Sequence, residues 1–222
     1  MTTLFLEQAR ERYPALCLSL IRLCCIVTVI LCIPTSTADE LEELSVTDAD
    51  GEYSLRIVGV LNVPADYVRK VITDYKHAYR IDPAITKVEV LPTDRDEVVR
   101  VRNFSEQCVG PFCFEIVWAG DIVETKDGDI QVKTIPELSN FASGSAIWRI
   151  RPQGEHTWVF YESRLKPAFF IPPVIGDIII EKHIKEDALN IFKNIERQAI
   201  TMLARDVRHQ PEYLKRLFRK RG

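Results

Sequence analysis

Hydrophobic residues recur with two different periods along the chain, and the period changes at recognisable turn sequences. Apolar and polar side chains alternate over residues 53–63, which predicts a β-strand. Val68, Val71 and Ile72 then follow Pro64 at helical spacing, which predicts short helices directly after that strand. Alternation returns in six further segments: 85–91, 97–108, 113–124, 129–135, 145–152 and 157–165. Short turns separate these segments, so we expect an antiparallel meander.

A long amphipathic helix is predicted from Pro172-Pro173 to about Ala204. At 100° per residue, its apolar residues fall on one face roughly 120° wide. These residues are Ile184, Ala188, Ile191, Phe192, Ile195, Ala199, Met202 and Leu203. Charged residues lie opposite, at Lys182, Glu186, Lys193 and Arg197. A helix with one apolar face of this kind packs on a sheet.

The first 38 residues differ from the rest of the chain. An uncharged apolar run at residues 23–33 follows a charged start, and Ser36-Thr37-Ala38 supplies small residues at a cleavage point. These features predict a signal peptide over residues 1–38 and an exported protein, periplasmic or secreted. The alternative is an uncleaved membrane anchor over residues 15–33. Arg22 would lie near its middle, at a cost of about 2.5–3.5 kcal/mol.

Charge is distributed unevenly around one expected domain at residues 53–204. The 222-residue chain is 46% hydrophobic with a net charge of −3, so it lacks the basic excess of a nucleic-acid binder. Residues 39–52 are interpreted as an acidic lead-in. Residues 205–222 form a basic amphipathic tail, which is either a solvated end or a segment attracted to anionic lipid headgroups.

Cleavage after residue 38 would leave Cys108 and Cys113 as the cysteines of the mature chain. An even pair in an exported protein predicts one disulfide. Gly110-Pro111 is a turn signal between two strand-like segments, so the bridge would pin a hairpin. A redox pair and a metal site are the alternatives, and the spacing is wider than the CxxC spacing that either would favour.

The order of these elements resembles the START-like (SRPBCC, helix-grip) superfamily, in particular its polyketide cyclase/dehydrase and coenzyme Q-binding branch. The resemblance covers about residues 53–203 and rests on the first strand, the Val63-Pro64-Ala65 helix entry and Pro172-Pro173. It implies an α+β helix-grip fold, with a curved antiparallel sheet of about seven strands around the long C-terminal helix. It also implies an elongated apolar cavity between them. Members bind lipids, sterols, quinones or polyketides, and a minority are enzymes.

Aromatic side chains and one carboxylate are the candidate ligand-binding groups. They are Tyr79, Phe104, Trp118, Trp148, Tyr161 and Glu181. In a helix-grip fold the concave sheet face lines the pocket, and alternation places Trp148 and Trp118 inward, whereas ordinary core packing is the alternative. Glu181 falls on the apolar seam of the helix. It is either solvated near the helix start or faces the cavity, where it would have to be paired or protonated.

The connection at residues 167–175 carries no charge, although connections are normally polar. Two interpretations fit Phe169, Phe170 and Ile171. They tuck under the start of the helix, or they form an apolar lip that meets a membrane or a delivery partner.

Recognised catalytic and cofactor motifs are absent from the sequence. The histidines at 77, 156, 183 and 209 lack metal-site spacing, and we interpret each as a surface or satisfied histidine. No metal or cofactor is expected. We therefore expect an exported binding or carrier protein for a hydrophobic small molecule. The alternatives are a cyclase/dehydratase-type enzyme that uses a cavity carboxylate or Tyr, and an interaction module with a collapsed pocket.

Overall fold

The structure is a computed structural model of the chain, and it describes residues 40–109, 111–171 and 177–209. The predicted signal peptide, the Pro172-Pro173 helix entry and most of the basic tail lie outside these residues. Among the helices that are described, none combines the length and the apolar character needed to cross a membrane.

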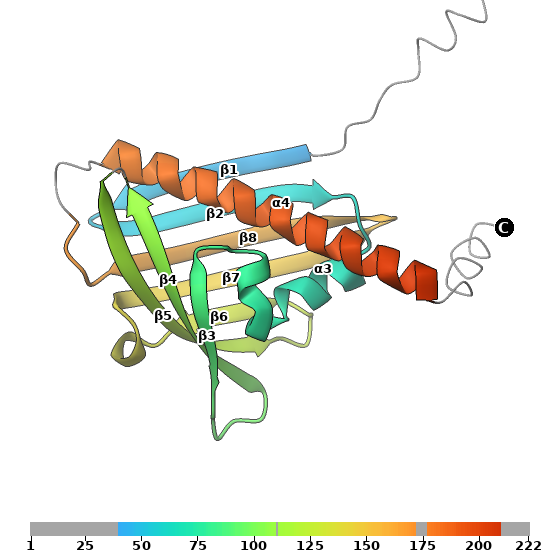
Figure 1. The fold of residues 1–222 in the computed structure, drawn as a ribbon, viewed down its shortest axis with the longest axis horizontal. Coiled ribbons are helices and arrows are strands. Elements are labelled where there is room, and N and C mark those ends of the chain that lie inside the picture. Colours follow the sequence, from blue (N-terminus) through green and yellow to red (C-terminus); the bar gives the residue numbers. More distant parts are fainter. Residues whose placement is uncertain (1–39, 110, 172–176, 210–222) are drawn as a thin grey trace, which may run out of the picture. The chain divides into compact units, whose positions relative to one another are not determined.

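One sheet of eight antiparallel strands forms the framework (Figure 1). The strands are β1 (Glu40–Ala49), β2 (Glu52–Leu61), β3 (Ile85–Leu91), β4 (Val98–Val109), β5 (Phe112–Glu124), β6 (Ile130–Thr134), β7 (Phe141–Gln153) and β8 (His156–Pro167). Their order is β1-β2-β8-β7-β6-β5-β4-β3. The expected meander is confirmed from β3 to β8, and β2 pairs with the last strand of that meander.

The strand that we did not predict is β1, which lies within the range interpreted as an acidic lead-in. Leu44 and Val46 pair with Ile57 and Leu55 of β2 and pack toward the core, while the acidic residues before and after them mask the apolar alternation. The turn between the strands is Asp50-Gly51, and both residues have positive φ angles, 53° and 74°. An Asp-Gly pair is a strong hairpin signal, because a two-residue turn of this kind needs left-handed backbone at both positions.

The helices lie on one side of this sheet. They are α3 (Ala65–Ile72), the 3₁₀ helix η1 (Tyr75–Arg80) and the long α4 (Asp177–His209), and a further short 3₁₀ turn, η2, spans Pro136–Leu138. The predicted helix entry is correct within one residue, because Pro64 is the N-cap of α3. The C-terminal helix extends beyond the predicted end near Ala204.

The position of α4 shows that the sheet curves around it. The helix contacts β1 and β2 near one edge of the sheet and also β4 near the other edge. Its apolar face agrees with the predicted one, since Ala188, Phe192, Ile195 and Ala199 are all buried. The α+β helix-grip fold is therefore confirmed, with eight strands in place of about seven.

Solid packing is concentrated against the second half of α4. Phe192 and Ile195 belong to a core cluster with Val68 of α3 and Val159 of β8. The hydroxyl of Tyr67 on α3 also donates a hydrogen bond to the Asp206 carboxylate of α4, at 3.0 Å. Because α3 covers this half of the helix, the first half meets the sheet without such a layer.

Candidate ligand-binding cavity

A cavity of about 290 Å³ lies between the first half of α4 and the inner face of the sheet. Its apolar lining consists of Leu55, Phe114, Ile116, Phe141, Leu165, Pro167, Phe169, Ile171, Ile180, Ile184, Ala188 and Ile191. Its polar lining consists of Tyr53, Gln107, Tyr161, Ser163, His183 and Asp187. An apolar wall with a few polar groups is typical of a small-molecule site, and the volume is at the lower end of the usual range of about 300–1,000 Å³.

Small side chains line this space on both sides. Ser163 of β8 belongs to the cavity wall on the side of the sheet. On α4 the cavity is lined by Ala188, one turn before the larger Phe192 of the solid core. Sheet and helix therefore approach without filling the gap between them.

Tyr161 is the predicted ligand-binding residue that lines the cavity. Burial raises the pKa of its hydroxyl above the ordinary value, and a hydrogen bond with Ser163 opposes that rise. The tilted rings of Trp148 and Tyr161 pack together, with centroids 4.2 Å apart. Trp118 donates a hydrogen bond from Nε1 to the hydroxyl of Thr134, at 3.1 Å. Both indoles pack against the core cluster beside the cavity and are not part of its lining.

The other predicted ligand-binding residues lie away from the cavity. Phe104 lies between two cations, with Lys87 Nζ 5.2 Å and Arg102 Cζ 5.3 Å from its ring centroid. Tyr79 is 47% exposed on η1. Glu181 is half-buried, with its carboxylate 3.9 Å from Lys185 Nζ. Local sequence patterns place these residues on strands and helices. They do not decide which face of each strand or helix meets the cavity.

Sequence reasoning missed five of the six polar residues of the cavity wall, among them His183 and Asp187 of α4. They are separated by one turn of α4, and Nε2 of His183 lies 3.4 Å from Oδ2 of Asp187. Burial raises the pKa of the Asp187 carboxyl, the His183 ring lowers it, and Glu186 raises it. The interpretation of His183 as a surface or satisfied histidine stays a prediction, and the structure adds that its ring lines the cavity. The available signal was its spacing, since Ile180, Ile184 and Ile191 surround it on the same helix.

The uncharged connection after β8 has both buried and exposed apolar side chains. Phe169 tucks inward, with its ring centroid 5.8 Å from that of Phe114 and 5.9 Å from that of Phe141. Ile171 also lines the cavity. Phe170, between them, is 75% exposed. Residues 172–175 of the connection lie outside the described ranges.

Exposed apolar side chains occur at the same end of the cavity. Phe112 at the β4–β5 hairpin and Ile179 at the start of α4 are exposed, as is Phe170. Each is within two residues of a side chain that lines the cavity. In Figure 1 the β4–β5 hairpin, the end of β8 and the first turns of α4 share one end of the sheet.

The cysteine pair also lies at this end. Cys108 and Cys113 are register partners at the β4–β5 hairpin, with Cα atoms 4.0 Å apart and sulfur atoms at bonding distance. The neighbouring residues Gln107 and Phe114 line the cavity. A Glu106 carboxylate oxygen lies within 4.8 Å of both sulfurs, so the structure brings together the groups for either the predicted disulfide or the alternative metal site. The disulfide stays a prediction.

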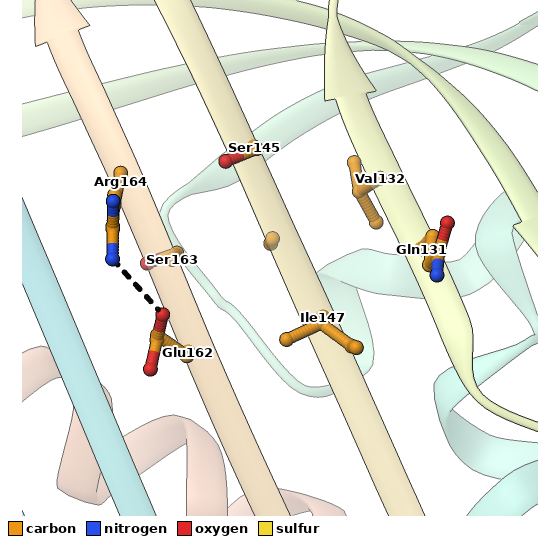
Figure 2. A pocket seen from close by; sticks show the side chains of 8 residues that line it. Gln131, Val132, Ser145, Ile147, Glu162, Ser163 and Arg164 are labelled. Atoms are coloured by element: carbon orange, nitrogen blue, oxygen red, sulfur yellow. Dashed lines mark ion pairs between the residues drawn. The ribbon is translucent and has the colours of Figure 1, made fainter.

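A second hollow, of about 220 Å³, lies on the opposite face of the sheet (Figure 2). Its side chains include Gln131 of β6 and Ser145 of β7, and Arg164 Nη2 lies 3.5 Å from Glu162 Oε1 on β8. Gln131, Ser145 and Arg164 are exposed, so the hollow opens to solvent on a polar surface. It offers little apolar area to a hydrophobic ligand, and the cavity under α4 is the better candidate.

Solved structures share this fold at low sequence identity. The Zhui aromatase/cyclase from Streptomyces sp. R1128 matches with a TM-score of 0.56 and 16% identity, over 68% of this chain and 96% of that one. A STAR-related lipid transfer protein from Xanthomonas axonopodis matches with a TM-score of 0.52 and 18% identity, over 70% and 98%. Human STARD10 matches with a TM-score of 0.52 and 11% identity, over 80% and 81%. Neither family models nor curated protein sequences match the chain.

These likenesses establish the architecture. The chain has the START-like helix-grip fold, in which a curved sheet wraps around a long C-terminal helix, and in this chain a mostly apolar cavity lies between the two.

Proposed function

We propose that the protein binds and carries a hydrophobic small molecule, a lipid, quinone or polyketide-like compound, in the cavity under α4. The observation that carries the proposal is the cavity itself, whose wall is mostly apolar and remains open beside a solid core. Each Å² of apolar ligand surface that leaves water there contributes about 25 cal/mol. Two of the similar structures are named for lipid transfer and for an aromatase/cyclase, which supports a ligand of this class.

The test is native mass spectrometry of the purified full chain, followed by extraction of any bound molecule under denaturing conditions. We expect a hydrophobic molecule to copurify with the wild type. Ile184→Trp would fill the cavity and abolish the bound mass, because the larger ring occupies ligand space. Ile200→Trp is the matched control, since Ile200 is exposed on the same helix outside the cavity. A wild type without bound material, or two variants that retain it equally, would contradict the proposal.

The exposed residues at the cavity end support a second part of the proposal, which is transient contact with a membrane. Phe112, Phe170 and Ile179 present apolar surface where a ligand would enter. Phe170→Asp should weaken flotation with phosphatidylcholine vesicles. Val90→Asp is the control, because Val90 is exposed on β3 away from the cavity lining. Equal flotation of the two variants would count against the contact.

Export is the third part of the proposal, and it is supported by the sequence pattern of residues 1–38. N-terminal sequencing of protein recovered from outside the cytoplasm should find Asp39 at the start. Recovery of a chain that begins at Met1 would favour the membrane-anchored alternative.

An enzyme of the cyclase/dehydratase type is the second candidate, and a specific observation favours it. Asp187, His183 and Tyr161 all line the cavity, so it contains groups suited to moving protons on a bound molecule. The test is incubation of the extracted molecule with fresh protein and analysis of its mass. A product that Asp187→Asn fails to form would favour the enzyme, and an unchanged molecule would favour the carrier.

A further inference from the structure

Four of the six polar residues that line the cavity form two pairs with different hydrogen bonding. Tyr161 and Ser163, on β8, hydrogen-bond to each other. His183 and Asp187, on α4, lie 3.4 Å apart between Nε2 and Oδ2. Within the described part of the chain, the buried Nε2 atom of His183 has no hydrogen-bond partner. A buried nitrogen without a partner is costly, so this pair has unused capacity that a ligand can satisfy.

The charges around this pair are unfavourable for an anion. Among the described residues that line the cavity, none is Lys or Arg. The nearby lysines of α4 face other acids, since Lys185 Nζ lies 3.9 Å from Glu181 and Lys182 Nζ lies 3.8 Å from Glu186. A carboxylate or phosphate that entered the cavity would therefore lose water and meet the Asp187 carboxylate without a Lys or Arg partner.

A hydroxyl group can form a hydrogen bond with each member of the His183–Asp187 pair. Its oxygen accepts a hydrogen bond from the imidazole N–H of His183, and its hydrogen is donated to the carboxylate of Asp187. A carbonyl oxygen can accept the hydrogen bond from His183 but has no hydrogen to donate to Asp187. The apolar body of the same molecule would lie against Ile184, Ile116 and Leu165, which belong to the same wall.

We propose that His183 and Asp187 form the recognition site for the hydroxyl head of an uncharged amphipathic ligand, and that they select such an alcohol over the carboxylate of equal chain length. This inference rests on the proposed function, because it concerns the ligand of the same cavity. It adds the chemical class of the ligand head and the two residues that determine the choice.

The experiment compares 1-dodecanol with dodecanoate, two probes that differ in the head group alone. Binding of each to the delipidated full chain is measured by fluorescence and native mass spectrometry at pH 8, where dodecanoate is ionised. We expect dodecanol to bind at least about tenfold more tightly, because the carboxylate would remain unpaired. Dodecanoate binding that equals or exceeds dodecanol binding would overturn the inference while leaving the carrier function in place.

Variants on one helix separate the pair from general charge effects. Asp187→Asn should strengthen dodecanoate binding and so reduce the ratio of dodecanol affinity to dodecanoate affinity. Glu186→Gln removes the same charge from the next position, whose side chain is 58% exposed, and should leave the ratio unchanged. His183→Phe should weaken dodecanol binding, and His183→Gln should restore part of it because the amide also donates a hydrogen bond.

Three results would contradict the assignment. Equal shifts from Asp187→Asn and Glu186→Gln would show that overall charge, and not the pair, sets the ratio. Unchanged dodecanol binding in His183→Phe would remove His183 from the site. If neither probe binds and the purified protein carries no molecule, the carrier function fails together with the inference. The comparison of the two probes on the wild type holds even if a variant does not fold.

Discussion

The indole of Trp148 packs against the phenol ring of Tyr161 at an interplanar angle of 37°, with ring centroids 4.2 Å apart, because the two residues are register partners on β7 and β8. Tyr161 lines the cavity, and Trp148 packs against the core beside it. A ligand that contacts Tyr161 should therefore alter the surroundings of Trp148, a fluorescent side chain that does not itself line the cavity.

Ligand binding should therefore change the emission of Trp148. A variant that keeps only this tryptophan, Trp118→Phe/Trp158→Phe, is expected to show a shift in emission maximum or intensity on addition of ligand. The matched variant keeps only Trp158, which alternates with the cavity-facing residues of β8 and stacks on Phe160. It should show no such change. Equal responses from the two variants would mean that the ligand does not bind beside Tyr161.

Substitution of Gly120 by Ala should destabilise the sheet beside the cavity. A Cβ at this position would lie 2.5 Å from Cζ2 of Trp118 and 3.0 Å from the carbonyl oxygen of Lys133. Forcing extra volume into a packed site typically costs about 1–3 kcal/mol. The free energy of unfolding, measured in urea, is expected to fall by that amount.

A double-mutant cycle identifies the cause of that loss. In a Trp118→Phe background the atoms nearest to the added Cβ are absent, so Gly120→Ala should cost less than it does in the wild type. Additive effects of the two substitutions would show that the indole is not the group that excludes a larger residue.

Stability should decline at high pH because of Tyr75. Burial and the charge of Glu124 raise the pKa of its hydroxyl from 10.0 to about 12, and Arg69 opposes them. Between these values the unfolded chain loses the proton and the folded chain keeps it. The contribution of Tyr75 is thus complete below about pH 10 and is lost as the pH rises toward 12.

Urea unfolding at several alkaline pH values tests this dependence. Tyr75→Phe should flatten the decline above about pH 10. Tyr79→Phe, at a largely exposed tyrosine, should leave it unchanged. The same decline in all three proteins would indicate that other groups are responsible. Burial also raises the pKa of Tyr161, so part of the decline should remain in Tyr75→Phe.

Reduction of the predicted Cys108–Cys113 disulfide should lower the free energy of unfolding by about 2 kcal/mol, since it closes a short loop. Unfolding with and without reductant measures the effect. The double variant Cys108→Ser/Cys113→Ser should be insensitive to reductant. Two titratable thiols in the purified, unreduced protein would contradict the disulfide. Zinc-dependent stabilisation of that protein, lost in Glu106→Gln, would instead support the metal site.

Local patterns predicted most of the secondary structure. The strand at β3 was predicted with its observed bounds, and the ends of the other predicted strands differ by a few residues. Alternation depends only on neighbouring side chains along one strand, so it can be read from the sequence. The first strand was missed because its acidic residues suggested a solvated lead-in, although the Asp50-Gly51 turn was a usable signal.

The cavity residues were harder to predict for a different reason. Tyr161 and His183 are far apart in sequence. They line the same cavity only because β8 and α4 pack together. Phe104 has the same aromatic character as Tyr161, but its strand turns it toward Lys87 and Arg102. Side-chain type alone could not separate these two cases.

The amino-acid sequence by itself determined the elements, their order and the apolar face of the last helix, because periodicity is a local property of the chain. Only the tertiary structure decided where the space between sheet and helix stays open and that His183 and Asp187 line it. That outcome depends on the sizes of side chains contributed by distant strands, and on the half of α4 that α3 leaves uncovered.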